Sequence, residues 1–258
     1  MAVKQIENLL KLLEFFSERK KPATLADVVA HFGWARSSAF NILTTLVENG
    51  YLYEPKARAG FYPSPRWLQL AKAIAEGEPI SENLRQLLAD LAEQTGETVW
   101  ISASSGLFAV FIEVVESEAS VRYAAKAGKR VPIHATASGQ ALLSQLPDHD
   151  LGVSLRKVSF ERYSTNTPMS IPEVLAQIEA GRRRGWFASA SNYSPDLGGV
   201  AVPVMDRGRV YSVTVAGPLY RVRDKAIDHA NTIYKNINRI YGSEHSRSTL
   251  KNIDLPLL

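Results

Sequence analysis

One stretch decides the fold of the front of this chain: LADVVAHFGWARSSAFNILTTL, residues 25–46 of 258. Thr24 stands before it as a helix cap, and Gly33 follows Phe32 where a short helix ends. A second helix begins near Arg36, because apolar residues repeat there at i, i+3, i+4 and i+7: Ala39, Ile42, Leu43 and Leu46. Two helices joined by a tight turn are typical of a helix-turn-helix unit.

The outward side of the second helix is mostly polar. Its residues are Arg36, Ser37, Ser38, Phe40, Asn41 and Thr44. An α-helix fits the major groove of B-DNA, where Arg, Asn, Ser and Thr reach base edges and phosphates. This face therefore predicts DNA contact. The alternative is a solvated helix that binds another protein, which the aromatic Phe40 and Trp34 favour.

The flanking segments predict a winged helix. A preceding helix that ends before Pro22 would turn inward Ile6, Leu9, Leu10, Leu13 and Phe16. Residues 51–53 and 60–63 are expected to form two strands, with Lys56 and Arg58 at the tip between them, where they could reach flanking phosphates or the minor groove. Eight basic and three acidic residues lie between Arg19 and Lys72, so basic character is concentrated toward the front of a chain whose net charge is +4.

A second domain is expected after Gly77-Glu78-Pro79. We expect the winged helix-turn-helix domain at residues 1–64, a linker helix at 65–79 and the second domain at 80–258. Its expected helices cover residues 81–96, 137–146, 172–184 and 224–241, the last turning inward Ile227, Ile233, Tyr234, Ile237 and Ile240. Its expected strands cover 99–102, 108–115, 121–125, 131–134, 200–205 and 209–215. This order predicts an α+β fold, a sheet with helices packed on its faces.

Composition excludes several classes of protein. The chain has no cysteine, and its five histidines never show the i, i+4 spacing of a helical metal pair, so we expect neither a metal site nor a cofactor. No segment approaches the roughly 18–20 uncharged residues that a membrane helix requires. The first residues lack the apolar core of a secretion signal, so we expect a cytoplasmic protein with no membrane partner.

The usual catalytic motifs are missing from the sequence, so we do not expect an enzyme. Residues 154–157 fit the S-x-x-K pattern, but the companion motifs S-D-N and K-T-G are absent. A hydrolase that uses Ser154 and Lys157 is the weakest alternative.

Four blocks resemble, in the right order, the IclR family of bacterial transcription regulators. They are LADVVAHFGWARSSAFNILTTLVENGYL (25–52), GKRVPIHATASGQALL (128–143), RGWF (184–187) and VTVAGP (213–218). The resemblance implies an N-terminal winged helix-turn-helix that binds double-stranded operator DNA, and a C-terminal GAF-like effector-binding domain. It implies a ligand-responsive regulator, such as a repressor, that works as a homodimer or homotetramer. A two-fold dimer would bind a palindromic operator.

The sequence departs from the family pattern at two positions. Asn41 stands on the recognition helix where the family commonly has Arg, and Gln140 stands where it has Lys. Because Asn prefers adenine and Arg prefers guanine, the first departure bears on the operator sequence.

The alternative function is a small-molecule sensor that acts through protein partners without binding DNA.

The effector pocket is expected where the helix of the second block begins. Thr136, Ala137, Ser138 and Gly139 combine small side chains with the free N–H groups of a helix start, which suit a carboxylate. The resemblance puts the facing wall at residues 189–199 and at the strand that holds Thr214 and Ala216; the expected ligand contacts in the loop are Ser191, Asn192, Tyr193 and Ser194. Apolar area would come from Trp100, Phe108 and Tyr193. We therefore expect a small aliphatic or aromatic carboxylate as effector. We expect Arg182, Arg183 and Arg184 to form a solvated helix end.

Overall fold

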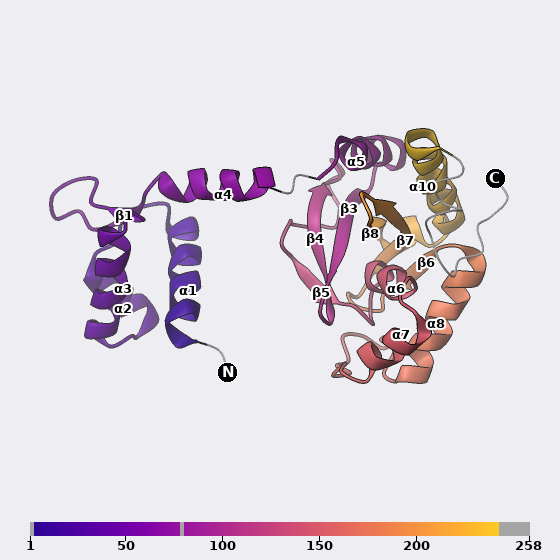
Figure 1. The fold of residues 1–258 in the computed structure, drawn as a ribbon, viewed down its shortest axis with the longest axis horizontal. Coiled ribbons are helices and arrows are strands. Elements are labelled where there is room, and N and C mark those ends of the chain that lie inside the picture. The colour runs from indigo at the N-terminus through magenta and orange to yellow at the C-terminus, as the bar shows by residue number, and fades with distance from the viewer. Residues whose placement is uncertain (1–2, 78–79, 243–258) are drawn as a thin grey trace. The chain divides into compact units, whose positions relative to one another are not determined.

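The chain forms two compact units, residues 1–79 and 80–258, in a computed structural model that describes residues 3–77 and 80–242 (Figure 1). The N-terminal unit is a winged helix-turn-helix, as the sequence predicts. Its elements are α1 (Lys4–Arg19), α2 (Leu25–Phe32), α3 (Arg36–Glu48), β1 (Leu52–Tyr53), β2 (Tyr62–Pro63) and α4 (Arg66–Gly77).

Local chemistry fixes the ends of α2. The Thr24 hydroxyl accepts a hydrogen bond from the Asp27 N–H, and the Asp27 carboxylate accepts bonds from the Thr24 N–H and hydroxyl. These bonds hold the pKa of Asp27 below its usual value. Gly33 ends the helix with a φ of +65°, a backbone conformation that suits glycine.

The inward face predicted for α1 is partly wrong. Leu12, Phe15 and Phe16 are buried against α2 and α3, whereas Ile6 and Leu10 are each 56 % exposed. Apolar residues occupy two faces of this helix, so their spacing alone could not show which face meets the core.

The wing is attached to the helices at two places. Ala23 pairs with Phe61 next to the wing strands, and a Cβ at Gly60 would lie 2.5 Å from the Ala23 carbonyl carbon. At the other end, the indole N–H of Trp67 in α4 donates to the Tyr51 carbonyl at 3.0 Å. The loop between these anchors carries Lys56 and Arg58.

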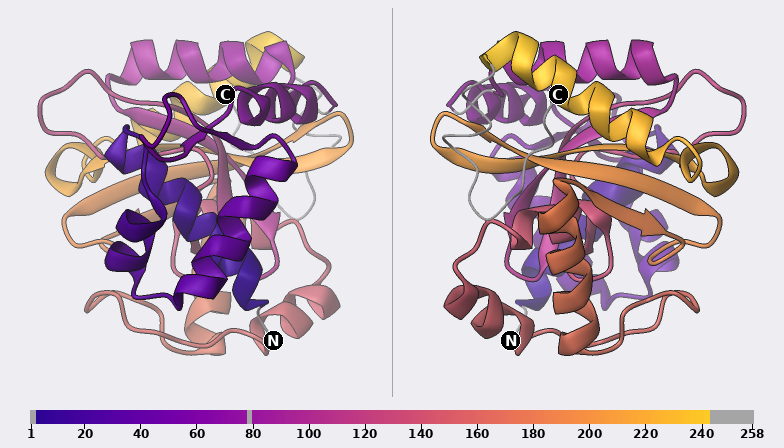
Figure 2. Two further views of the ribbon diagram at one scale, coloured as in Figure 1. Left: turned by 90° about the vertical axis from the view of Figure 1, so that its left-hand side faces the viewer. Right: turned by 90° about the vertical axis from the view of Figure 1, so that its right-hand side faces the viewer.

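The C-terminal unit is a GAF-like sandwich built on one antiparallel sheet in the order β5-β4-β3-β8-β7-β6. The strands are β3 (Thr98–Ser105), β4 (Phe108–Val115), β5 (Arg130–Pro132), β6 (Phe187–Ala190), β7 (Leu197–Asp206) and β8 (Arg209–Pro218). Helices α5 (Glu82–Thr95) and α10 (Ala226–Tyr241) cover one face. Helices α6 (Ala137–Leu143) and α8 (Ile171–Arg184) cover the other face, and α7 (Asp148–Leu155) lies between them along the chain. The short helix α9 (Leu219–Val222) follows β8. Figure 2 shows the layers from two further sides. None of the described helices is long and apolar enough to cross a membrane.

Successive side chains of each strand point to opposite faces of the sheet, one of which packs against α5 and α10. We call the opposite face the second face. Val213 and Val215 of β8 are packed beneath α5 and α10, whereas Ala216 belongs to a separate cluster on the opposite face. Val99 and Trp100 of β3 divide in the same way. The side chains of the second face therefore lie outside the core formed with α5 and α10.

Several C-terminal elements differ from the sequence predictions. Residues 121–125 form no strand; instead the Thr98 hydroxyl donates to the Tyr123 carbonyl, and Arg221 donates to the Val121 carbonyl. The sequence analysis missed α7, α9 and β6, which have four to eight residues and little periodicity to detect. Ile227 was predicted to face inward but lies at the exposed start of α10.

Helix α6 comes unusually close to the segment that follows β5. A Cβ at Gly139 would lie 2.1 Å from the Ile133 carbonyl oxygen, so this position has no room for a side chain. The approach brings the beginning of α6 against β8 and β3.

Replacing Gly139 by alanine should therefore lower Tm, with a loss of about 1–3 kcal/mol, because α6 must move away from Ile133. Gly152→Ala in α7 is the matched control, since its new Cβ would meet only the end of Arg156 at 3.4 Å. The control should keep or raise Tm, because alanine favours a helix by about 0.5–1 kcal/mol. Thermal unfolding followed by circular dichroism measures both, and equal effects would contradict the close approach.

Candidate functional site

The outward face of α3 carries the side chains that the sequence analysis assigned to DNA. Ala39, Leu43 and Leu46 are buried, which turns the opposite side of the helix to solvent. Exposed on that side are Arg36, Ser37, Ser38, Phe40 and Asn41, with Thr44 half-buried. All six residues thus lie outside the buried core of the N-terminal unit.

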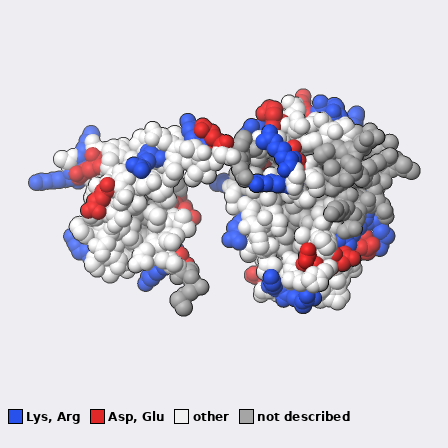
Figure 3. All heavy atoms as spheres, in the orientation of Figure 1, with Lys and Arg blue, Asp and Glu red and all other residues white. Residues whose placement is uncertain are grey.

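The wing tip adds positive charge to the same unit. Lys56 and Arg58 are exposed, and basic side chains project from the loop between β1 and β2 (Figure 3). The loop is shaped by Glu54, whose carboxylate accepts the Arg58 N–H at 2.6 Å. Arg58 adopts a φ of +65° at this turn.

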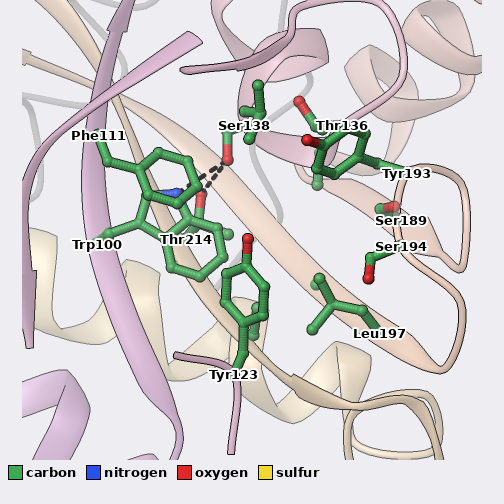
Figure 4. Close-up of a pocket in the computed structure, with 14 residues that line it drawn as sticks. Trp100, Phe111, Tyr123, Thr136, Ser138, Ser189, Tyr193, Ser194, Leu197 and Thr214 are labelled. Carbon is green, nitrogen blue, oxygen red and sulfur yellow. Dashed lines mark hydrogen bonds between the residues drawn. The ribbon is translucent and has the colours of Figure 1, made fainter. Parts of the chain in front are cut away.

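A pocket opens on the second face of the C-terminal sheet, with about 390 Å³ of space not filled by atoms, part of it open to solvent (Figure 4). It lies between the start of α6, strands β3, β4, β7 and β8, and the loop that follows β6. Its walls are mainly apolar and aromatic, and none of the described residues that line it is acidic. The residues are Trp100, Phe111, Tyr123, Val131, Thr136, Ala137, Ser138, Ser189, Tyr193, Ser194, Leu197, Gly199, Thr214 and Ala216.

Three polar groups meet at the inner end of this pocket. Ser138 Oγ accepts the indole N–H of Trp100 at 3.1 Å and lies 3.0 Å from Thr214 Oγ1. Both hydroxyl groups are 1 % exposed. Between them they carry two hydrogens, of which one forms their mutual bond. The other hydrogen has no acceptor among the described residues, so the pair is a hydrogen-bond donor directed at whatever fills the pocket.

Thr136 has a structural task. Its hydroxyl donates to the Pro132 carbonyl at 3.0 Å and accepts the Gly139 N–H at 3.1 Å. The expectation that the Gly139 N–H is free is therefore wrong. Gly139 lies behind the pocket wall, where it permits the close approach of α6 to Ile133.

Three further expected residues do not line the pocket. Asn192 turns away, because its amide bonds the Ala190 N–H and the Gln177 side chain. Ser191 has a φ of +59°, and its carbonyl accepts a bond from Ser164. The guanidinium carbon of Arg130 lies over the Phe108 ring, 4.2 Å from the centroid of that ring. The other expected residues in this region line the wall: Trp100, Thr136, Ala137, Ser138, Tyr193, Ser194, Thr214 and Ala216.

Three residues of the wall were not expected from the sequence: Phe111, Tyr123 and Val131. Phe111 could have been found, because it pairs with Ser102 and so faces the same side of the sheet as Trp100, 4.6 Å away between ring centroids. Tyr123 carried no comparable signal, since it lies in an irregular segment.

Two further motifs of the sequence, the three arginines at 182–184 and the S-x-x-K pattern at 154–157, lie outside the pocket. The Arg182 side chain is largely buried and donates to the Ser144 carbonyl at the end of α6, which corrects the expectation of a solvated helix end for this residue. Arg183 and Arg184 are both exposed, and Arg184 stacks on Trp186. No hydrogen bond joins the Ser154 hydroxyl to Lys157 in the described part of the chain, and Lys157 faces solvent.

Comparison with known proteins assigns both units. Residues 72–239 match the family model described as bacterial transcriptional regulator IclR C-terminal, and residues 5–55 match the IclR helix-turn-helix domain. The HTH-type transcriptional regulator BhcR of Paracoccus denitrificans is 26 % identical over 86 % of this chain and 80 % of its own. The transcriptional repressor IclR of Escherichia coli is 24 % identical over 88 % of this chain and 85 % of its own.

Solved structures show the same fold. The Thermotoga maritima IclR superposes with a TM-score of 0.76 at 22 % identity, covering 92 % of this chain and 97 % of that protein. An IclR homologue from Microbacterium hydrocarbonoxydans, complexed with 4-hydroxybenzoate, gives 0.63 at 20 % identity, covering 91 % and 99 %. With a DNA-binding winged helix in front and an effector domain behind it, the chain belongs to the IclR family of bacterial transcriptional regulators.

Proposed function

We propose that this regulator binds a palindromic operator as a dimer or tetramer and changes its DNA affinity or assembly when a small carboxylate occupies the pocket. The observation that carries the proposal is the buried Ser138–Thr214 pair, which presents a donor hydrogen to an apolar pocket. A ligand alters DNA affinity only as far as it binds one arrangement of the protein better than another.

The polarity of the pocket supports a carboxylate. A buried donor without an acceptor is costly, and a carboxylate oxygen meets this need better than a neutral oxygen because charged hydrogen bonds are stronger. Trp100, Phe111 and Tyr193 supply apolar area for the rest of the ligand, aliphatic or aromatic. The 4-hydroxybenzoate in the Microbacterium homologue is an acid of this class.

Exposed apolar residues in the N-terminal unit support self-association. Helix α1 exposes Ile6 and Leu10, and Val3 just before it is also exposed. Helix α4 exposes Leu68, Leu70 and Ile74 and buries none of its residues. Two helices with exposed apolar sides are expected to bury them against a second copy. A two-fold dimer would present two α3 helices to successive turns of DNA.

The first prediction concerns DNA. On the best site selected from random fragments, Asn41→Ala should cost about 1–3 kcal/mol and relax the preference at one base pair per half-site. Lys56→Ala should weaken binding to all sequences and reduce the slope of log affinity against log salt concentration by about 1. Lys235→Ala, which removes an exposed lysine of α10, is the control and should leave both the affinity and the slope unchanged. Gel shifts at several salt concentrations measure the DNA affinity of each variant and its salt dependence. Unchanged binding by both wing and helix variants would favour a protein partner for this face.

The second prediction concerns assembly. Ile74→Glu should convert the dimer to a monomer at micromolar concentration, because it places a charge on the exposed apolar side of α4. Ile227→Glu on α10 is the matched control, since Ile74 and Ile227 are 69 % and 65 % exposed. Sedimentation velocity measures both. A dimer that survives Ile74→Glu would place the interface elsewhere.

The third prediction concerns the ligand. Thr214→Val keeps the shape of the side chain but removes one hydroxyl from the Ser138–Thr214 pair, so the best acid from a calorimetric screen should bind at least about tenfold more weakly. Ser212→Ala on the same strand is the control, because its buried hydroxyl has no partner in the described residues and does not line the pocket. Equal affinity of wild type and Thr214→Val would contradict a role of the Ser138–Thr214 pair in ligand binding.

A further inference from the structure

Tyr123 and Lys129 form a polar pair at the rim of the pocket. The Lys129 ammonium donates to the Tyr123 phenolic oxygen at 2.7 Å and lies 4.9 Å from the centroid of its ring. Tyr123 lines the pocket, and Figure 4 shows its hydroxyl directed toward Ser138 and Thr214. Neither residue belongs to a strand or helix.

The hydrogen count makes Tyr123 a second donor. An ammonium group has hydrogens only to give, so the Tyr123 oxygen accepts from Lys129 and its own hydrogen is left for another acceptor. No described residue accepts that hydrogen. It is available on the side where the hydroxyl faces Ser138 and Thr214.

The charge of Lys129 is not neutralised nearby. No carboxylate among the described residues pairs with its ammonium, and the described lining of the pocket contains no acid. Lys129 is half-buried, so water screens its field less than that of an exposed lysine. A negative charge in the pocket would be attracted to it through the Tyr123 hydroxyl.

The segment that carries the pair is fixed before any ligand arrives. The buried Thr98 hydroxyl donates to the Tyr123 carbonyl at 2.8 Å. Arg221, held by two bonds of 2.7 and 2.8 Å to the buried Glu97, donates to the Val121 carbonyl. The Lys129 carbonyl accepts the Phe111 N–H of β4 at 2.9 Å. Groups held in place in this way lose little entropy when a ligand binds.

We propose that Tyr123 and Lys129 are the residues that make the pocket selective for anions. The Tyr123 hydroxyl donates to one carboxylate oxygen of the ligand while the Ser138–Thr214 pair donates to the carboxylate from the other side, and Lys129 supplies the charge that distinguishes an acid from its neutral amide. This inference rests on the proposed function, because it assumes that the same pocket holds the effector.

Paired ligands test the inference. Acetate, benzoate and 4-hydroxybenzoate are titrated by calorimetry beside acetamide, benzamide and 4-hydroxybenzamide. Wild type should bind its best acid at least about tenfold more tightly than the matching amide, and added salt should weaken only the acid. Lys129→Met should lower the ratio of acid to amide affinity about tenfold, and Tyr123→Phe should weaken the acid about tenfold.

Two controls separate charge from packing. Lys126→Met removes an exposed lysine from the same segment and should leave the ratio unchanged. Lys129→Arg keeps the charge and should keep the preference for the acid. A ratio that is equal in wild type and Lys129→Met would overturn the inference, as would a wild type that binds amides as well as acids.

The results that would contradict the proposed function differ from those that would contradict this inference. Loss of selectivity in Lys129→Met together with normal acid binding by Thr214→Val would support the rim pair but contradict the inner hydroxyl pair. Acid binding that weakens in Thr214→Val but keeps its acid preference in Lys129→Met would support the pocket and contradict this inference. Absence of binding by every acid and amide would contradict both.

Discussion

The close approach of α6 to the backbone at Ile133 is the constraint on which the pocket depends. Glycine at position 139 is what allows it, since a Cβ there would overlap the Ile133 carbonyl. At this distance Ser138 reaches both Trp100 and Thr214, and the two hydroxyls share one bond 3.0 Å long. A helix displaced by the width of a methyl group would separate them, leaving two buried hydroxyls and an indole N–H without partners.

The sheet beneath the pocket serves stability and recognition on opposite faces. Val213 and Val215 pack into the core with α5 and α10. Thr214, which stands between these two residues in the strand, faces the pocket on the opposite side of the sheet. Because successive side chains of a strand point to opposite faces, a change at Thr214 leaves the core contacts intact. A substitution at Thr214 should therefore change ligand binding without changing the fold.

Much of the architecture follows from local sequence signals. The caps at Thr24 and Ser81, the glycines at the ends of α2 and α5, and the apolar spacing of α3 each correspond to the structure. Two features were not accessible in this way. Helix α1 is apolar on two faces, and the choice between them depends on its neighbours in three dimensions. Val121, Arg122 and Tyr123 alternate like a strand, but side-chain bonds to their carbonyls hold them in an irregular path instead.

The candidate site was predictable where it lies on regular structure. The small residues that begin α6 predicted a site at Ser138, and the resemblance to the family put the strand of Thr214 in the facing wall; the two hydroxyl oxygens lie 3.0 Å apart. Loop positions were less accessible: Ser191 and Asn192 have the polar side chains that a binding loop needs, yet both are used to shape the loop. The rim pair of Tyr123 and Lys129 depends on how the segment after β4 is tied to β3 and α9, which no local pattern reveals.

We propose that ligand and operator bind different units of one chain and influence each other. Thermodynamic linkage makes this coupling reciprocal, so the factor by which the acid changes operator affinity must equal the factor by which the operator changes acid affinity. Calorimetry of the best acid with the free protein and with the protein–operator complex measures it directly. The two dissociation constants should differ by about 5–150-fold, the usual range of such coupling. Identical constants in the two titrations would show that the pocket does not control DNA binding.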